Sequence, residues 1–192
     1  MKNICIYCGS AAGTNPEYIA TARRLGGILA ERGVGLVYGG GRVGLMGVVA
    51  DAVLAGGGRV VGVIPEALLS KEIAHDGLTE LHVVADMHQR KALMARRADA
   101  FLTLPGGIGT FEEFFEALSW AALQLHHKPM GVLNVAGYFD PLLALLDHAV
   151  AERFLRREIL DLLVISAEPE VILSELAART PAHRPRQKID FE

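Results

Sequence analysis

The sequence contains only two cysteines, and both lie in the run Cys5-Ile6-Tyr7-Cys8. The C-x-x-C spacing could indicate a redox pair or half of a zinc site. A zinc site would need a second pair of ligands, and no other cysteine exists to supply it. The run also has the pattern of a buried strand, in which side chains three positions apart point to opposite faces. We therefore expect two buried thiols with a structural role.

Long hydrophobic runs are missing as well. The longest stretch without a charged residue is the 14 positions from Asn3 to Pro16, which include glycine, asparagine, threonine and proline. This is too short to span a bilayer, so no transmembrane helix is expected. The sequence starts with Lys2-Asn3 and a short apolar run, without the long hydrophobic segment of a secretory signal. We expect a cytoplasmic protein that does not contact membranes.

Blocks of like charge are also absent. The 19 Lys and Arg residues stand against 22 Asp and Glu residues, which gives a net charge of −3, and the basic residues are scattered along the chain. This pattern offers no electrostatic footprint for nucleic acid. A polymeric nucleic-acid partner is therefore not expected.

What the sequence does contain is a regular alternation of short apolar runs with longer segments of helical period. Its length of 192 residues suits one domain, which we place at residues 1–179, followed by a frayed tail at residues 180–192. The predicted strands are Asn3 to Tyr7, Val34 to Tyr38, Arg59 to Ile64, Ala100 to Leu104, Met130 to Leu133 and Leu162 to Ile165. The predicted helices are Pro16 to Arg32, Gly44 to Ala55, Met87 to Ala98, Thr110 to Leu125 and Tyr138 to Arg153.

This alternation predicts the α/β class with a single Rossmann-like, doubly wound domain. Strands without polar alternation are buried on both faces, and intervening helices cover both faces of a parallel sheet. Such sheets bind ligands at the carboxyl ends of the strands, where the strand order switches. The polar connection from Pro65 to Glu80 is a candidate flap.

A first glycine-rich loop follows the second predicted strand. Gly39 to Gly44 matches G-x-G-x-x-G and precedes a helix, as in dinucleotide-binding proteins. However, the loop follows the second strand rather than the first, and the acidic candidate Glu66 comes after Pro65. We favour a phosphate loop made of Ser10, Gly39, Gly40 and Gly41 over an NAD site.

A second glycine-rich loop, Pro105 to Thr110, is more specific because Phe111-Glu112-Glu113 follows it. Glycines 106, 107 and 109 permit close approach of the backbone to an anion where the helix begins. We expect Thr110 to cap the helix and the carboxylates to lie in its first turn. For Glu113 a simple capping box with Thr110 remains an alternative to catalysis.

The segment Asp86 to Lys91 opens a helix with several basic residues. A solvated basic face is the ordinary explanation of such a run. This helix starts near the ligand end of the sheet only if the connection before it folds back over the cleft. His88 is interpreted as a surface or hydrogen-bonding residue, and His126-His127 as a polar helix end. We expect no metal, because no spacing of carboxylates and histidines resembles a metal site.

Taken together, Asp86 to Lys91, Pro105 to Glu113 and the turn Gly39-Gly40-Gly41 resemble the LOG family. Its members are cytokinin-activating phosphoribohydrolases that act on nucleoside 5′-monophosphates. The family signature P-G-G-x-G-T-x-x-E is present from Pro105 to Glu113. The resemblance covers nearly the whole chain, from Tyr7 to about Ile172.

The resemblance implies a site and an activity. It implies Arg90 and Glu113 as the catalytic pair, a homodimer, no cofactor, and a nucleotide such as AMP or a cytokinin ribotide as the ligand. Ser119 stands before Trp120 where many relatives have threonine. The implied substrate contacts are Glu72, Arg90, Lys91, Gly107, Ile108, Gly109, Thr110, Glu113 and Ser119.

The chemistry of these residue types agrees with the implied activity. Cleavage of an N-glycosidic bond develops positive charge on the ribose, which the Glu113 carboxylate can stabilise while it orients or deprotonates water. Arg90 can hold the phosphate or ribose, and Lys91 adds a point charge. The label of lysine decarboxylase, which members often carry, is rejected because no lysine lies in a recognisable pyridoxal-phosphate motif. A non-catalytic nucleotide carrier or sensor and an NAD(P)-dependent oxidoreductase remain alternatives.

Overall fold

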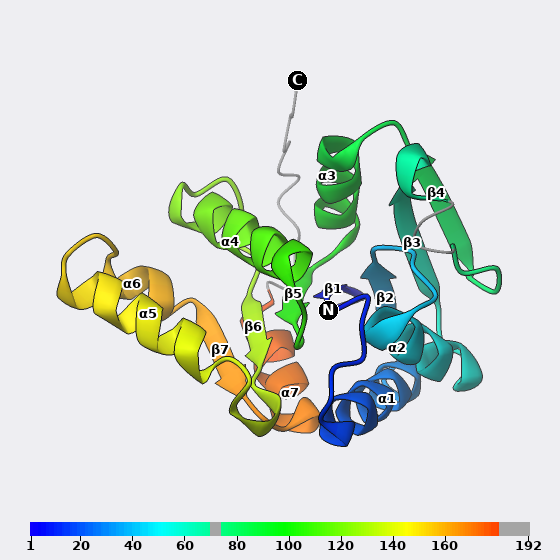
Figure 1. Ribbon diagram of the computed structural model, residues 1–192, viewed down its shortest axis with the longest axis horizontal. Coiled ribbons are helices and arrows are strands. Elements are labelled where there is room, and N and C mark those ends of the chain that lie inside the picture. The colour runs from blue at the N-terminus through cyan, green and yellow to red at the C-terminus, as the bar shows by residue number, and fades with distance from the viewer. Residues whose placement is uncertain (70–73, 181–192) are drawn as a thin grey trace.

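The computed structural model describes residues 1–69 and 74–180. Within these ranges seven parallel strands form one sheet in the order β4-β3-β2-β1-β5-β6-β7 (Figure 1). The predicted α/β class and the parallel sheet are confirmed. The predicted tail lies outside the described residues, apart from Thr180. The strands are β1 (Asn3–Tyr7), β2 (Gly35–Tyr38), β3 (Val60–Pro65), β4 (Glu80–Val84), β5 (Ala100–Thr103), β6 (Met130–Leu133) and β7 (Leu163–Ser166).

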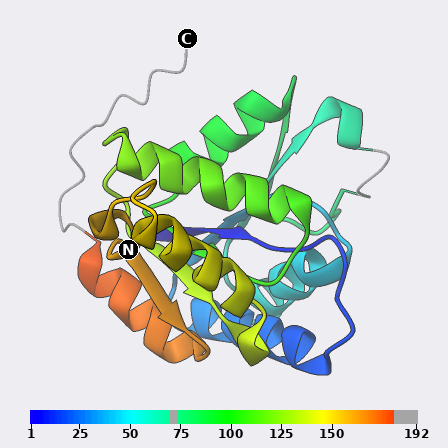
Figure 2. The ribbon, with the colours of Figure 1, turned by 60° about the vertical axis from the view of Figure 1, so that its left-hand side comes forward.

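Helices cover both faces of this sheet, as the doubly wound prediction requires. α1, α2 and α7 lie on one side, and α3 to α6 lie on the other (Figures 1 and 2). The α-helices are α1 (Pro16–Glu31), α2 (Gly44–Ala55), α3 (Met87–Arg97), α4 (Ile108–Ala122), α5 (Asp140–Ala151), α6 (Arg157–Leu160) and α7 (Pro169–Arg179), and two short 3₁₀ helices are η1 (Glu66–Leu68) and η2 (Val135–Gly137). In the described part of the chain, none of these helices has the length and apolar character needed to cross a membrane.

The central strand β1 contributes to both cores. Its residues are buried apart from Asn3, which is partly buried. Cys5 packs in the core under α3 and α4, whereas Cys8, just after the strand, packs in the core under α1 and α2. Both thiols are free and buried. The prediction of two structural thiols on opposite faces is confirmed.

One edge strand, β4, was not predicted. Its residues alternate between partly buried and exposed, because one face is open to solvent and one neighbour is missing. β4 pairs with β3 over five positions, from Val61 and Glu80 to Pro65 and Val84. The sequence segment interpreted as a flap therefore ends in a strand of the sheet. This strand returns the chain to the carboxyl edge, so α3 starts on the ligand side.

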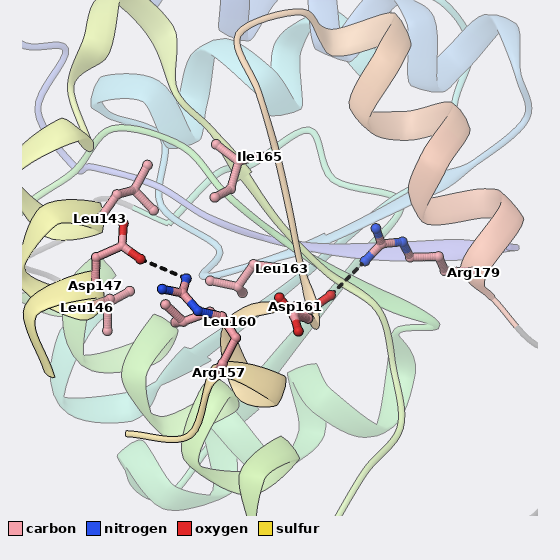
Figure 3. A pocket seen from close by; sticks show the side chains of 9 residues that line it. All are labelled: Leu143, Leu146, Asp147, Arg157, Leu160, Asp161, Leu163, Ile165 and Arg179. Carbon is pink, nitrogen blue, oxygen red and sulfur yellow. Dashed lines mark hydrogen bonds and ion pairs between the residues drawn. The ribbon is translucent and has the colours of Figure 1, made fainter. Parts of the chain in front are cut away.

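The other edge of the sheet, at β7, borders a cavity between α5, α6 and α7 (Figure 3). Its volume is about 470 Å³. Among the lining residues, the Arg157 guanidinium forms an ion pair with Asp147 at 2.8 Å, and Arg179 donates a hydrogen bond to the carbonyl of Asp161 (Figure 3). Both ion-pair partners are more than half exposed, so the pair is a surface feature.

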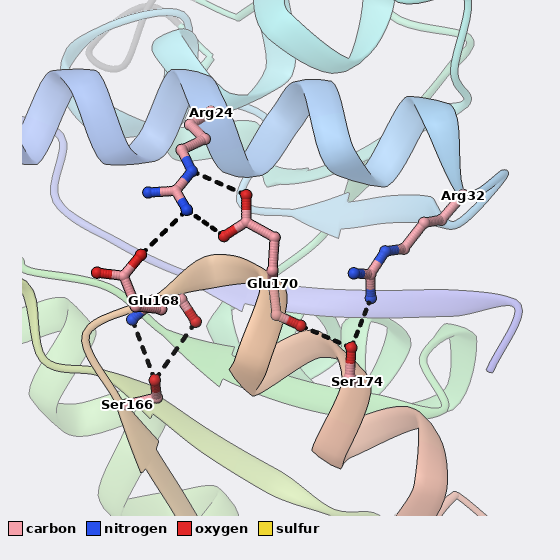
Figure 4. Close-up of polar contacts among 6 residues, drawn as sticks. All are labelled: Arg24, Arg32, Ser166, Glu168, Glu170 and Ser174. Carbon is pink, nitrogen blue, oxygen red and sulfur yellow. Dashed lines mark hydrogen bonds and ion pairs between the residues drawn. The ribbon is translucent and has the colours of Figure 1, made fainter.

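Polar contacts join the first and last α-helices, α1 and α7, which lie on the same face of the sheet. Arg24 of α1 pairs with Glu168 and Glu170, which stand at the start of α7 (Figure 4). At the C-terminal end of α1, Arg32 donates a hydrogen bond to Ser174 of α7 at 3.2 Å (Figure 4). These exposed contacts align α7 beside α1 above the shared apolar core.

Candidate functional site

The strand order switches between β1 and β5. From β1 the chain adds strands outward to β4 and then returns to β5, on the opposite side of β1. The loops that follow these two strands are joined by a hydrogen bond from the Gly9 N–H to the Pro105 carbonyl at 3.0 Å. The predicted ligand-binding loops therefore meet at the switch point, where α/β sheets of this type bind ligands.

A cavity of about 160 Å³ lies at this switch point. It is smaller than the cavity at β7 (Figure 3), but it gathers the predicted residues, whereas the β7 cavity contains none of them. We therefore assign the candidate site to the smaller cavity. It is lined by Ile6, Cys8, Gly9, Ser10, Gly39, Met46, Arg90, Gly107, Ile108, Gly109, Thr110 and Glu113.

The start of α4 forms one wall of this cavity. The helix begins at Ile108, with Gly107 as the N-cap residue and no side-chain cap. Thr110 is thus the third residue of the helix, and the prediction that it caps the helix is wrong. The carboxylates also lie beyond the first turn, because the first turn contains no acidic residue. The capping-box explanation of Glu113 is excluded, and the N–H groups of the first turn are left to bind an anion.

Gly106 shows why a glycine is needed before this helix. A Cβ atom at Gly106 would lie 2.1 Å from the Thr110 hydroxyl oxygen and 2.7 Å from the Gly9 nitrogen. At Gly107 a Cβ atom would meet nothing within 4 Å. Close packing of the loops after β1 and β5 therefore depends on Gly106, whereas Gly107 leaves space that opens to the cavity.

Arg90 and Glu113 face each other across the cavity. The Arg90 Nη2 atom lies 4.0 Å from Glu113 Oε1, and the two side chains are only 7% and 10% exposed. Arg90 also donates a hydrogen bond from Nη2 to the Gly39 carbonyl at 3.3 Å. A buried cation and a buried carboxylate are thus held close together beside the start of α4, on two different helices.

Lys91 is directed away from this cavity. Its Nζ atom contacts Glu112 at 2.5 Å and Glu116 at 2.9 Å, both on α4. Burial alone would lower the pKa of Lys91, but the hydrogen bonds to the two carboxylates outweigh it and raise that pKa. In this structure Lys91 ties α3 to α4, and its predicted contact with substrate stays a prediction.

The glycines after β2 have different surroundings. Gly39 lines the cavity, and a Cβ atom there would lie 2.0 Å from Arg90 Nη2. Gly40, with φ of +79°, packs against Ile64 and Leu81, and both Gly40 and Gly41 are buried outside the cavity lining. Close packing thus gives a reason for Gly39 and Gly40 that the phosphate-loop hypothesis did not include. The phosphate contact of all three glycines, like that of Ser10 in the lining, stays a prediction.

The remaining predicted substrate contacts are Glu72 and Ser119. Glu72 falls outside the described residues. Ser119 is exposed on α4, nine residues after Thr110, which corresponds to roughly 14 Å along the helix axis. Ser119 does not line the cavity of its own chain.

Sequence reasoning missed several residues near the site. Ile6, Cys8 and Met46 line the cavity, and the only available signal was that they are close in sequence to Ser10 or to the Gly39–Gly44 loop. Burial raises the pKa of Cys8 well above its usual range, so its thiol stays protonated. His75 was also missed: it is buried, hydrogen-bonded to Asp51 and adjacent to the Gly40 turn.

The interpretation of His126 as a polar helix end is wrong. α4 ends at Ala122, and His126 is buried against the Phe101 ring, with centroids 5.1 Å apart. Its ring contacts the Ala117 carbonyl at 2.9 Å and accepts a hydrogen bond from the Lys128 N–H. Burial lowers the pKa of His126 to about 4, so the ring is neutral at pH 7. His88, in contrast, is exposed as expected.

Metal-ligating side chains do not gather in the described ranges. Over residues 1–69 and 74–180, no group of three or more His, Cys, Asp or Glu side chains could hold a metal ion.

Solved structures with this fold include two proteins that handle the molybdenum cofactor. The molybdenum cofactor binding protein of Rippkaea orientalis matches with a TM-score of 0.69 and 22% identity, over 93% of this chain and 97% of that chain. The molybdenum cofactor carrier protein of Chlamydomonas reinhardtii matches with a TM-score of 0.69 and 20% identity, over 92% and 98% of the two chains. At these identities the similarity establishes the fold alone.

Sequence comparisons are closer. Residues 46–176 match the family model described as "Possible lysine decarboxylase". Cytokinin riboside 5′-monophosphate phosphoribohydrolase LOG7 of Arabidopsis thaliana is 54% identical over 154 residues, which cover 80% of this chain and 71% of the relative. Cytokinin riboside 5′-monophosphate phosphoribohydrolase LOG of Oryza sativa subsp. japonica is 45% identical over 182 residues, which cover 95% of this chain and 75% of the relative. With this level of identity, and with the signature at Pro105 to Glu113 forming the wall of the switch-point cavity, the chain belongs to the LOG family.

Proposed function

We propose that this protein is an N-glycosidase that hydrolyses nucleoside 5′-monophosphates to free base and ribose 5-phosphate. Its substrates are AMP, N6-modified adenine ribotides of the cytokinin type, or both. The observation that carries the proposal is the buried pair of Arg90 and Glu113, 4.0 Å apart beside the start of α4. We further propose that the protein acts in the cytoplasm.

Hydrolysis needs a group that stabilises a ribosyl cation and handles a water molecule. The Glu113 carboxylate lines a small cavity and is only 10% exposed, so its charge acts more strongly on a nearby cation than it would in bulk water. As the bond from C1′ to the base nitrogen breaks, its electron pair leaves with the base and a proton from water neutralises it. The remaining hydroxide oxygen bonds to C1′, and Glu113 orients this water and relays its single proton to the base nitrogen in the same step.

The phosphate is the natural anchor of such a substrate. The N–H groups in the first turn of α4 have no partner within the helix, and the positive end of the helix dipole points toward the cavity. Gly107 and Gly109 have no side chain that would block a phosphate. The space next to them is open, because a Cβ atom at either position would meet nothing within 4 Å. Arg90 supplies a fixed positive charge beside this anion site.

The test compares AMP with adenosine as substrates of the purified protein, with release of adenine and of ribose 5-phosphate or ribose as the readout. Phosphate binding contributes energy that positions the distant glycosidic bond, so AMP should react much faster than adenosine. Equal kcat/KM for the two compounds would overturn the phosphate anchor. Absence of any base release from AMP and from an isopentenyladenine ribotide would overturn the proposed function.

Two other functions are less well supported. A lysine decarboxylase that uses pyridoxal phosphate needs a lysine in the site, and the cavity lining in the described part of the chain includes none. A nucleotide carrier or sensor would not need Glu113 opposite Arg90. The AMP assay separates these functions, because a carrier binds the nucleotide without releasing the base.

We also propose that the protein is a homodimer joined through α4. This helix exposes Phe115, and Leu123 and Leu125 are exposed just beyond its end. Ser119 lies on the same helix and does not line its own cavity, so we further propose that its predicted contact is with a substrate in the second copy. Sedimentation at micromolar concentration should show a dimer, and Leu123→Asp should shift it toward monomer. A wild-type protein that sediments only as monomer would refute the dimer.

A further inference from the structure

We propose that His75 is a positioning residue, which fixes the turn after β2 and, through that turn, the guanidinium of Arg90. This inference rests on the proposed function, since it assigns Arg90 a task in the same site. His75 does not line the cavity, and no part of the proposed chemistry uses it.

The ring of His75 is held on both nitrogens. It is 8% exposed, its Nε2 atom lies 2.9 Å from Asp51 Oδ1 on α2, and the Gly77 N–H donates to Nδ1 at 3.1 Å. Because Nδ1 accepts a hydrogen bond, the proton of the neutral ring is assigned to Nε2, which donates to Asp51. The ring thus attaches the segment around His75 to helix α2.

The backbone of the same segment holds the glycine turn. The His75 N–H donates to the Gly40 carbonyl at 3.1 Å, and Ala74 pairs with Gly41 in an isolated antiparallel bridge. Three consecutive glycines have little conformational preference of their own, so a fixed geometry must come from contacts with neighbouring segments. The segment 74–77 provides these contacts from one side, and β3 provides them from the other.

The glycine turn from Gly39 to Gly41 holds Arg90. Gly39, next to Gly40, accepts the hydrogen bond from Arg90 Nη2, the atom that lies 4.0 Å from Glu113. A shift of the Gly39 carbonyl would therefore move or release the guanidinium in the cavity. A displacement of about 1 Å in a catalytic group can cost about 100-fold in rate.

The experiment begins with His75→Ala and a matched control. We expect His75→Ala to lower kcat for AMP by about 10- to 100-fold. The control is Asp76→Ala in the same segment. It should leave kcat unchanged, because it removes only the exposed ion pair between Asp76 and Arg42, whose charged atoms are 3.5 Å apart. An unchanged kcat in folded His75→Ala protein would overturn the inference.

A double-mutant cycle distinguishes positioning from a general structural role. In an Arg90→Ala background, His75→Ala should lower the residual turnover by less than about twofold, because the group it positions is already gone. A buried histidine that only stabilises the fold would lower turnover equally in both backgrounds, and that result would overturn the inference.

Two further measurements cover the case in which His75→Ala does not fold or the wild type releases no base. Asp51→Ala leaves His75 in place and removes only its support, whereas Asp51→Asn keeps an acceptor for Nε2. Arginine side-chain NMR then reads Arg90 directly, with its signal identified by its loss in Arg90→Ala. Hindered rotation of the guanidinium in the wild type and in Asp51→Asn, but averaged rotation in Asp51→Ala, supports the inference without any turnover. Identical Arg90 signals in all three proteins would overturn it, whereas failure of the proposed function appears separately, as absence of base release by the wild type.

Discussion

Replacing Glu113 by Gln removes a charge from the candidate site while keeping the size and shape of the side chain. Glu113 is the sixth residue of α4, beyond the first turn, so the change removes no helix cap and only a small interaction with the helix dipole. Any large effect on turnover must then come from the loss of the charge inside the cavity.

The distance in the structure sets the expected size of this effect. Two unit charges about 4 Å apart interact by about 4 kcal/mol at an effective dielectric constant of about 20. A ribosyl cation as near to Glu113 as the Arg90 guanidinium, at 4.0 Å, would lose stabilisation of that order. Since each 1.36 kcal/mol corresponds to a factor of about ten, we expect kcat to fall by about three powers of ten, within a range of about two to four.

Stability and binding should change much less. Arg90 loses an attractive partner, but the cost of burying the Glu113 carboxylate disappears as well, so we expect the free energy of unfolding to fall by less than the roughly 3–5 kcal/mol that removing one partner of a buried ion pair costs. The AMP phosphate still meets the start of α4 and Arg90, and calorimetry should show AMP binding close to that of the wild type.

The assay follows adenine release from AMP by chromatography, together with thermal unfolding of the same preparation. Arg90→Ala serves as a comparison, since it should lower turnover and weaken AMP binding together. A Glu113→Gln protein that melts normally and still releases adenine at a rate near that of the wild type would refute the assignment of Glu113 as the catalytic carboxylate.

Three further predictions concern other parts of the site and core. Gly106→Ala should lower the free energy of unfolding by about 1–3 kcal/mol in urea titrations, because its Cβ atom would lie 2.1 Å from Thr110 Oγ1, while Gly107→Ala should be tolerated. The pKa of His126 is lowered from 6.5 to about 4, so its contribution to stability is complete above pH 6.5 and is lost as the pH falls from 6.5 toward about 4. Unfolding free energies measured across this range should fall by at most about 1.4 kcal/mol per pH unit, and His126→Gln should flatten that slope. Lys91→Met should lower kcat, because it removes the ion pairs with Glu112 and Glu116 that tie α3 to α4. In the Glu113→Gln background the same change should leave AMP affinity within about threefold of the parent protein, and a larger loss of affinity would favour a direct contact between Lys91 and the phosphate.

Much of the fold could be predicted from the sequence, because most of its strands are buried on both faces and read as uninterrupted apolar runs. β4 could not, since an edge strand with one open face alternates Glu80 and His82 with apolar residues and resembles a polar connection. α7 was missed as well, although Pro169 stands at its first turn. The omission of β4 also left open which edge of the sheet the start of α3 approaches.

The candidate site was predicted in outline but not in detail. The signature from Pro105 to Glu113 indicated the correct wall of the cavity, while the start of α4 was placed two residues too late. Gly107 occupies the N-cap position and has no side chain. The sequence therefore contains no Ser, Thr, Asn or Asp at this position to indicate where the helix starts. The direction of Lys91 and the contacts of His75 depend on side chains from distant segments, which no local pattern records.

The central position of β1 has a consequence for synthesis of the protein. β1 pairs with β2 early, but its other edge waits for β5, whose register begins with Ile4 opposite Ala100. At about 5–20 residues per second, roughly 60 residues pass through the ribosome between β2 and β5, which takes roughly 3–12 s. During that interval the apolar edge of β1 has no strand partner, and an unpaired edge invites pairing with other chains. The growing chain is therefore exposed to pairing with other chains at an edge that the finished sheet covers.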